Sequence, residues 1–219
     1  MRFTSLLHGA LAATTLLAGA ALADGYYAGI EGARERLRFE PHYYEADGTP
    51  DGSFVNRARG SAGALFGGHR WTLSPDFSLA VEARLAISDT RWRLRIPDEP
   101  ASLHYDIPYS ASLTLQPAWH LSDRLALFAE AGIALGRIHE RKWDSPASTY
   151  DERRWRPGAV LGVGLSLRLG DAWSARLGYR ETRYRELRYE GRDGGGTVVE
   201  RIHDKPRQAD WHLGLMRHF

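Results

Sequence analysis

Apolar and polar residues alternate along most of this chain. From Phe77 to Ser88 every second residue is apolar, and small or charged residues stand between them. The same period of two recurs over residues 105–120, 125–135, 157–169 and 173–179. Within residues 105–120, Ile107 falls on the apolar face and Asp106 on the polar face. Because successive side chains of a strand point to opposite faces, the pattern predicts β-strands with one apolar and one polar face.

Short turns separate these stretches at equal intervals. Leu73, Leu121 and Leu169 each begin such a turn, and the same spacing carried to both ends predicts four hairpin units, or eight strands. Opposite the short turns lie longer segments rich in Gly, Pro, Asp and Ser, which predict irregular loops. These loops are residues 40–56, 97–103, 140–152 and 190–206.

The strand count and the turn lengths are typical of an outer-membrane barrel. Each apolar band covers about 11 residues, the length of a tilted strand that crosses the hydrocarbon layer. A soluble β-sandwich is the alternative, but it does not need eight up-and-down strands with aromatic residues at their ends. The sequence therefore predicts an all-β fold, namely an eight-stranded antiparallel up-and-down transmembrane β-barrel.

The N-terminus has the features of a secretory signal peptide. Arg2 precedes an apolar stretch from Leu6 to Ala21, and Ala21-Leu22-Ala23 supplies the small residues of a cleavage site. A membrane anchor is the alternative, but the apolar run is short. We expect a signal peptide over residues 1–23 and a barrel domain over residues 24–219, exported to the outer membrane. The chain has no cysteine, which excludes disulfides and thiolate metal sites.

Aromatic residues mark the short-turn end of the predicted barrel. Trp71, Phe77, Trp119 and Trp173 share the outward face there, as in the aromatic girdles of such proteins. The last strand alternates to an aromatic C-terminus through Trp211, Leu213, Leu215 and Phe219. With the Gly-rich segment Gly67-Gly68-His69-Arg70-Trp71, the pattern resembles the opacity/OmpX-like group of small outer-membrane barrels.

That resemblance implies a role for the last strand. In the group, the terminal aromatic strand is the signal read by the barrel-assembly machinery, so Trp211, Leu213, Leu215 and Phe219 are the expected assembly signal. Arg217 departs from the pattern, because this outward position is usually apolar or aromatic. An arginine here is expected to reach the periplasmic headgroups.

The inward-facing positions near the middle of the predicted strands include charged residues. An eight-stranded barrel is only just wide enough for its own side chains, so these residues predict a closed, salt-bridged lumen. The alternative is a proton or ion path, because ionisable groups inside a membrane are functional candidates. The predicted lumen network consists of Glu31, Glu82, Arg84, Glu130, Arg176, Arg180 and Asp210.

Arginine dominates the basic residues, since Lys142 and Lys205 are the only lysines among 29 Lys and Arg. Beyond the apolar band, toward the long loops, the outward-facing positions carry arginines on seven of the eight predicted strands. The guanidinium fork suits phosphate, so we expect this collar to contact lipopolysaccharide. The alternatives are a charged strand extension standing in water, or a GC-rich genome. The chosen contact candidates are Arg34, Arg36, Arg91, Arg93, Arg137, Arg183 and Arg185.

Catalytic chemistry has no clear signature in the sequence. His139 is the only outward histidine at a suitable height, and no serine lies near it on its face. His42, His104 and His203 are scattered in or near the predicted loops, without the spacing of a metal site. Outer-membrane proteases of this architecture need ten strands and a longer chain. We therefore expect neither an enzyme nor a metal or other cofactor.

The predicted function is that of a closed outer-membrane barrel acting as a structural or surface-interaction protein. Its expected partners are the outer membrane, lipopolysaccharide, host or cell surfaces and the barrel-assembly machinery, but no nucleic acid. A monomer is expected. The alternative function is a narrow channel for small apolar solutes, as in barrels that resemble OmpW.

Overall fold

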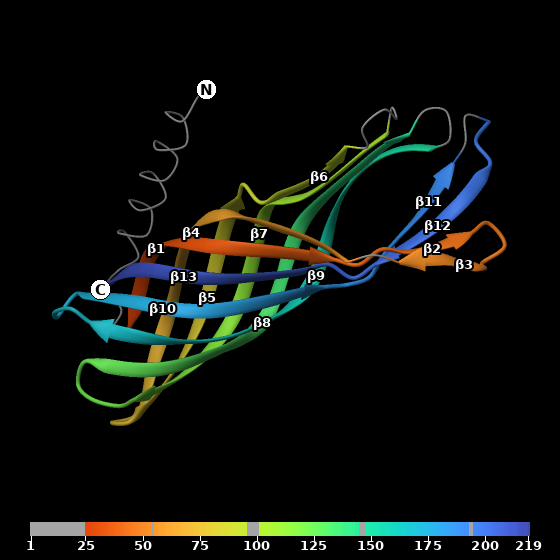
Figure 1. Ribbon diagram of the computed structural model, residues 1–219. Helices are drawn as coiled ribbons and strands as arrows, with labels where there is room; N and C mark the ends of the chain where they lie inside the picture. Colours follow the sequence, from red (N-terminus) through yellow and green to blue (C-terminus); the bar gives the residue numbers. More distant parts are fainter. Residues whose placement is uncertain (1–24, 54, 96–100, 145–147, 193–194) are drawn as a thin grey trace.

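The computed structural model describes residues 25–53, 55–95, 101–144, 148–192 and 195–219 (Figure 1). The predicted signal peptide, residues 1–23, lies outside the described residues. Within the described ranges, no helix is long and apolar enough to cross a membrane. All of the elements are β-strands.

Eight strands form the barrel, which confirms the predicted fold. They are β1 (Tyr26–Phe39), β4 (Asn56–Ser74), β5 (Phe77–Ser88), β7 (Ala101–His120), β8 (Leu125–Asp144), β9 (Ser148–Arg168), β10 (Trp173–Tyr184) and β13 (Arg207–His218). Each pairs antiparallel with the next in this order. Strand β1 also pairs with β13, so the pairings form a closed cycle. The short turns fall at Pro75-Asp76, 121–124 and 169–172, as the equal spacing predicts.

The long segments opposite these turns differ from the prediction, because much of their backbone is paired rather than irregular. Further strands lie in these segments or beside them, namely β2 (His42–Glu45), β3 (Pro50–Ser53), β6 (Arg91–Arg95), β11 (Leu187–Arg192) and β12 (Val198–Asp204). Strand β6 pairs with the start of β7, and the other four form a sheet in the order β11-β12-β2-β3. We call these strands and the loop-side ends of the barrel strands the extension, which projects from one end of the barrel in Figure 1.

The wall of the barrel is apolar on its outer side. Leu85, Ile133 and Leu213 are 65%, 66% and 64% exposed, as expected of side chains that face lipid. At the turn side, the predicted girdle of Trp71, Phe77, Trp119 and Trp173 is exposed. A second group of aromatic residues, which the sequence analysis did not identify, lies at the other edge of the apolar band: Tyr109, Trp155, Tyr179 and Trp211.

Inside the extension the polarity of the barrel is reversed. Its interior is a hydrophobic core, in which Phe39 stacks on Tyr105 with ring centroids 4.4 Å apart. The buried members are Leu37, Phe39, Ala58, Tyr105, Ile107, Ile138, Tyr184, Leu187 and Ile202. Leu187 and Ile202 come from β11 and β12, so packing of these side chains explains why the predicted loops are ordered strands.

A bulge in β7 changes which residues face outward. Asp106 pairs with His139, and Tyr109 pairs with Arg137, so β7 has one more residue between these pairs than β8 has. Pro108 lies in the extra segment, where it has no backbone N–H to donate to a ladder. Ile107 is therefore buried in the core, and Asp106 shares the outer face with His139, the reverse of the predicted parity.

Candidate functional site

Glu31 stands at the centre of the lumen. Its carboxylate accepts hydrogen bonds from three guanidinium groups, those of Arg84 at 2.9 Å, Arg176 at 2.7 Å and Arg180 at 3.1 Å. All four side chains are buried. Since Arg84 lies on β5 and the other two arginines on β10, these bonds cross the lumen and connect opposite walls.

The remaining predicted members surround this centre. Arg176 also donates to Glu82 at 2.6 Å, and Arg180 donates to Glu130 at 2.6 Å. Asp210 lies 3.8 Å from Arg180. The structure thus brings together all seven residues that the sequence analysis selected for the lumen. The four acids and three arginines largely compensate one another's charge in a space that water scarcely reaches.

Several members of this network were missed. The Tyr27 hydroxyl donates to Glu82 at 3.1 Å, and His212 lies 2.8 Å from Asp210. Nearer the extension, Gln208 donates to Glu35. All four of these residues have the same inward parity as the predicted ones, so a complete count of polar residues on that parity could have found them.

Apolar side chains close the network on both sides. Tyr27, Phe66, Ala80 and Met216 form a buried cluster toward the turn side, and the Arg176 guanidinium lies 3.5 Å from the centre of the Phe66 ring. The hydrophobic core of the extension lies toward the loop side. Between network and core a cavity of about 10 Å³ remains, which is room for a single water molecule.

A row of arginines crosses four adjacent strands on the outer surface. Arg183 pairs directly with Arg207, Arg207 with Arg38, and Arg38 with Arg57. One step closer to the membrane, Arg36 pairs with Arg59. With Arg34 these residues form what we call the arginine face: Arg34, Arg36, Arg38, Arg57, Arg59, Arg183 and Arg207, on β1, β4, β10 and β13.

Such pairing is unusual, because like charges directly opposite each other destabilise a sheet. Among the described residues, only two acids contact the arginine face: Glu181, 2.6 Å from Arg183, and Glu40, 3.1 Å from Arg38. Arg34 donates to the Ser61 hydroxyl at 3.2 Å. The face therefore carries a clear excess of positive charge.

The arginine face begins directly at the aromatic edge of the apolar band. Trp211 pairs with Arg34 on one side and with Tyr179 on the other, and the two aromatic rings are 5.2 Å apart. Tyr and Trp at such an edge mark the headgroup layer of a membrane. The arginine face therefore lies at and just above that layer.

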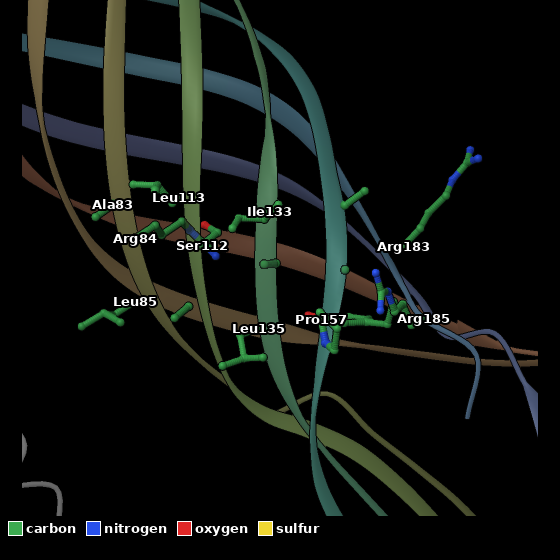
Figure 2. A pocket seen from close by; sticks show the side chains of 15 residues that line it. Ala83, Arg84, Leu85, Ser112, Leu113, Ile133, Leu135, Pro157, Arg183 and Arg185 are labelled. Carbon is green, nitrogen blue, oxygen red and sulfur yellow. The ribbon is translucent and has the colours of Figure 1, made fainter. Parts of the chain in front are cut away.

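A groove of about 750 Å³ runs across the outer side of β5, β7, β8 and β9 and ends at β10. Figure 2 shows Leu85, Ile133 and Leu135 along it, with Arg183 and Arg185 at its far end. Both arginines were predicted contact candidates. The groove therefore joins an apolar floor to two guanidinium groups.

The other predicted contact candidates lie on a different side of the extension. Arg91 and Arg93 are on β6, and Arg137 lies on β8 between Tyr109 and Trp155. Arg93 donates to His104 Nδ1 at 3.3 Å. Acids, histidines and arginines alternate here, in what we call the mixed patch: Arg91, Arg93, His104, Asp106, His139, Arg141, Asp151 and Arg153.

Within the mixed patch, His104 lies close to a second histidine and a carboxylate, although the sequence showed it only as one of several scattered histidines. His104, Asp106 and His139 offer ligand atoms that lie within 4.8 Å of one another. Strict alternation places Asp106 on the inner face, so the sequence did not predict this group. The bulge at Ile107-Pro108 leaves no mark in the alternation, so parity alone could not reveal the cluster.

The predicted assembly residues lie along the outer side of the last strand. Trp211, Leu213 and Leu215 are exposed, and so is Phe219 at the C-terminus. The backbone N–H of Phe219 donates to the Tyr26 carbonyl at 3.0 Å, which ties the end of the chain to the first strand. The unexpected Arg217 lies with its guanidinium carbon 5.3 Å from the Phe219 ring centre, so an aromatic face accommodates its charge.

No protein-family model matches the chain, and no curated protein sequence is similar to it. Solved structures nevertheless share its fold. The outer membrane protease OmpT of Escherichia coli has a TM-score of 0.59 at 10% identity, over 90% of this chain and 98% of that one. OprG of Pseudomonas aeruginosa has a TM-score of 0.54 at 8% identity, over 91% and 98%. Neisserial surface protein A has a TM-score of 0.51 at 15% identity, over 90% and 98%.

These likenesses confirm that the chain has the fold of small bacterial outer-membrane barrels. They also overturn the prediction that it is not an enzyme. Besides the lack of a catalytic motif, that prediction used the premise that proteases of this architecture need ten strands and a longer chain. OmpT is a protease, and nearly its whole length aligns with this chain. The size and the architecture are therefore compatible with enzymatic activity.

Proposed function

We propose that this protein is an outer-membrane barrel that binds the phosphate groups of lipopolysaccharide through its arginine face. The observation that carries the proposal is the row Arg183, Arg207, Arg38 and Arg57, paired across four adjacent strands immediately above the aromatic edge. A row of like charges has a cost in a free sheet, and an anion that bridges neighbouring guanidiniums removes that cost. Phosphates at headgroup height are such anions.

The chemistry of arginine supports the same ligand. Each guanidinium is planar and donates two parallel hydrogen bonds, which matches two oxygens of one phosphate. A single contact of this kind at a membrane surface contributes about 1 kcal/mol. Arg36, Arg59 and Arg207 have no carboxylate partner among the described residues, so their donors are available to a ligand.

The groove that ends at Arg183 and Arg185 extends this proposal to the lipid part of the molecule. Its floor is apolar, with Leu85 65% and Ile133 66% exposed. An acyl chain of lipopolysaccharide lying along this floor places its phosphate near the two guanidinium groups. The groove therefore fits a phosphorylated glycolipid better than a free phosphate ion.

We also propose that the lumen is closed. A channel for apolar solutes needs a continuous uncharged path, whereas Glu31 and the three guanidiniums around it occupy the centre of this barrel. Apolar clusters fill the interior above and below them. In planar lipid bilayers the refolded protein is expected to give no steady conductance, and a reproducible open-channel current contradicts the proposal.

The arginine face is tested by replacing Arg36, Arg59 and Arg207 with glutamine. Lipopolysaccharide binding by the refolded protein in detergent should weaken about a hundredfold, since three contacts of about 1 kcal/mol are lost. Lysine at the same positions should restore only part of the binding, because an ammonium lacks the planar fork. Ionic strength is held constant, because salt screens exposed charges over about 8 Å.

A matched control changes the net charge equally elsewhere. Arg124, Arg154 and Arg188 are exposed and lie outside the arginine face. Replacing these three with glutamine should leave binding close to that of the parent. If both triple variants bind lipopolysaccharide equally well, total charge governs binding and the arginine face is an ordinary solvated surface.

A further inference from the structure

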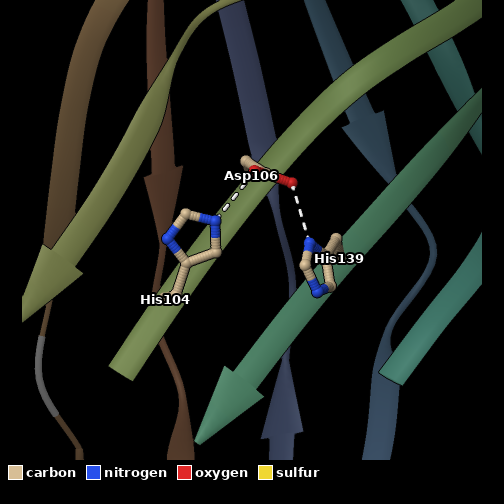
Figure 3. A group of neighbouring side chains, drawn as sticks. All are labelled: His104, Asp106 and His139. Atoms are coloured by element: carbon tan, nitrogen blue, oxygen red, sulfur yellow. Dashed lines mark hydrogen bonds and ion pairs between the residues drawn. The ribbon is translucent and has the colours of Figure 1, made fainter. Parts of the chain in front are cut away.

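Two histidines and an aspartate meet on the outer side of the mixed patch (Figure 3). His104 and Asp106 lie on β7 and His139 faces them from β8. His104 Nε2 is 2.8 Å from Asp106 Oδ2, and His139 Nδ1 is 3.5 Å from Asp106 Oδ1. The carboxylate thus stands between two imidazole rings whose centroids are 5.5 Å apart.

Asp106 is a buried acid with an incompletely satisfied carboxylate. Its residue is 7% exposed, and its Oδ1 atom is buried without a hydrogen-bond donor. A buried carboxylate oxygen that lacks a donor loses its hydration without compensation. A cation placed between this oxygen and the nearby ring nitrogens supplies the missing interaction.

A second layer of interactions already orients His139. Its Nε2 atom lies 3.1 Å from Asp151 Oδ1, while Nδ1 faces Asp106. Asp151 is in turn 3.4 Å from Arg141 and 3.5 Å from Arg153. A histidine that directs one nitrogen at a ligand position and donates the other N–H to an anchored carboxylate is the usual arrangement in protein metal sites.

We propose that His104, Asp106 and His139 bind a divalent transition-metal ion. Two imidazole nitrogens and one carboxylate oxygen form a donor set that suits zinc, and three protein ligands leave a further position for water. The bulge at Ile107-Pro108 creates the site, because it brings Asp106 to the face that already carries His139.

Arg93 competes with the metal. It donates from Nε to His104 Nδ1 at 3.3 Å, which keeps the ring proton on Nε2, the nitrogen that faces Asp106. A metal on Nε2 requires that proton to leave, and the Nδ1 that then carries a hydrogen no longer accepts from Arg93. Arg93 is exposed and able to turn away. Its removal is therefore expected to strengthen metal binding.

A second group of possible ligands, Glu31, Asp210 and His212, lies in the lumen. It differs in one decisive respect. The oxygens of Glu31 already accept hydrogen bonds from guanidinium groups on both sides of the lumen. Arginine side chains already provide the positive charge that a metal ion would bring to this group. We therefore propose no metal at Glu31, Asp210 and His212.

The test is a calorimetric titration of the refolded full-length protein in detergent with Zn²⁺. The parent should bind one equivalent, and Asp106→Asn should weaken binding at least tenfold. Arg93→Gln should bind more tightly than the parent. His203→Ala removes a histidine of the extension outside the site and serves as the control, with unchanged binding expected.

The ligand set has its own spectroscopic test with Co²⁺. The parent should give visible absorption bands typical of a low-symmetry nitrogen and oxygen site, and His139→Ala should lose them. Variants are compared only after the shift in gel mobility on boiling shows that the barrel has formed. If Asp106→Asn does not fold, His104→Ala replaces it. Unchanged Zn²⁺ binding in the folded variants, or equal loss in His203→Ala, overturns the proposal without affecting the arginine face.

Discussion

The membrane band and the extension of this barrel use the same strands with opposite polarity. In the band, Leu85 and Ile133 face outward and Glu130 faces inward. In the extension, Arg36 faces outward and Leu37 faces inward, although both lie on the strand that carries Ile30 and Glu31. The backbone geometry is common to both parts, so only the surrounding solvent differs. Lipid selects apolar outer side chains, whereas water selects charged ones and drives the apolar ones inward.

The two parts consequently rely on different forces. In the band, the outer side chains stay in contact with lipid, so the hydrophobic effect contributes little to its stability. The band is stabilised instead by paired charges in the lumen and by backbone hydrogen bonds between the strands. The extension has a hydrophobic core of the kind found in water-soluble proteins. Substitutions that act on one part and leave the other unchanged therefore test the comparison.

The largest effect is expected from Glu130→Ala in the band. Arg180 donates to this carboxylate at 2.6 Å and 3.3 Å, and its removal leaves a buried guanidinium short of a partner. The free energy of unfolding should fall by about 3–5 kcal/mol. Leu127→Ala, at an outward position three residues earlier on β8, should cost much less because lipid replaces the lost contacts. Urea unfolding in lipid vesicles, followed by tryptophan fluorescence, compares the two variants, and equal losses contradict this account.

A somewhat smaller loss is expected from Leu37→Ala in the extension. Leu37 is fully buried in its core, so truncation should lower stability by about 2–5 kcal/mol. The loss should be local, since the salt network below lies in another layer of the interior. Limited proteolysis should then cleave β11 and β12 while the barrel remains resistant. If barrel and extension instead unfold together in the variant, they form one cooperative unit, and the proposed difference between the two parts is wrong.

The sequence predicted the band well for a simple physical reason. Lipid on one side and a narrow lumen on the other enforce strict alternation. The apolar Leu85 is therefore recognisable as lipid-facing and the charged Glu82 as lumen-facing. It predicted the extension poorly, because strand pairing there depends on packing between segments far apart in the chain, such as Phe39 against Tyr105. Composition alone marked the segments that contain β2, β3 and β12 as loops.

The candidate sites divide in the same way. Parity located the outward arginines and the lumen charges, but the direct pairing of Arg38 with Arg207 depends on register, which alternation does not fix. The cluster of His104, Asp106 and His139 depends on one extra residue in β7. The prediction that the chain is not an enzyme failed differently. It was drawn from the lack of a catalytic motif and from chain length, and OmpT, a protease, aligns with this chain over 98% of its own length.

The smallest and most local effect concerns Asp204, the last residue of β12 in the extension. The pKa of this carboxyl is raised to about 7, chiefly by burial and also by the charge of Glu140, against the lowering effect of the Glu40 N–H, which donates to it at 2.8 Å. The folded protein therefore holds this proton more tightly than the unfolded chain does. The stabilisation is complete below the ordinary pKa of 3.8 and is lost as the pH rises through about 7.

Asp204→Asn should remove this dependence, because the amide is neutral at every pH and its oxygen still accepts from the Glu40 N–H. At pH 8, hydrogen exchange of the β11–β12 hairpin in the parent should be faster than the pH dependence of the intrinsic chemical rate predicts. The variant should not show this acceleration, and the difference between parent and variant should be smaller at pH 5. Asp47→Asn, in the exposed turn between β2 and β3, is the control and should behave as the parent does between these pH values. A hairpin in the parent whose protection does not change from pH 5 to pH 8 shows that water reaches Asp204, and that the core of the extension ends short of it.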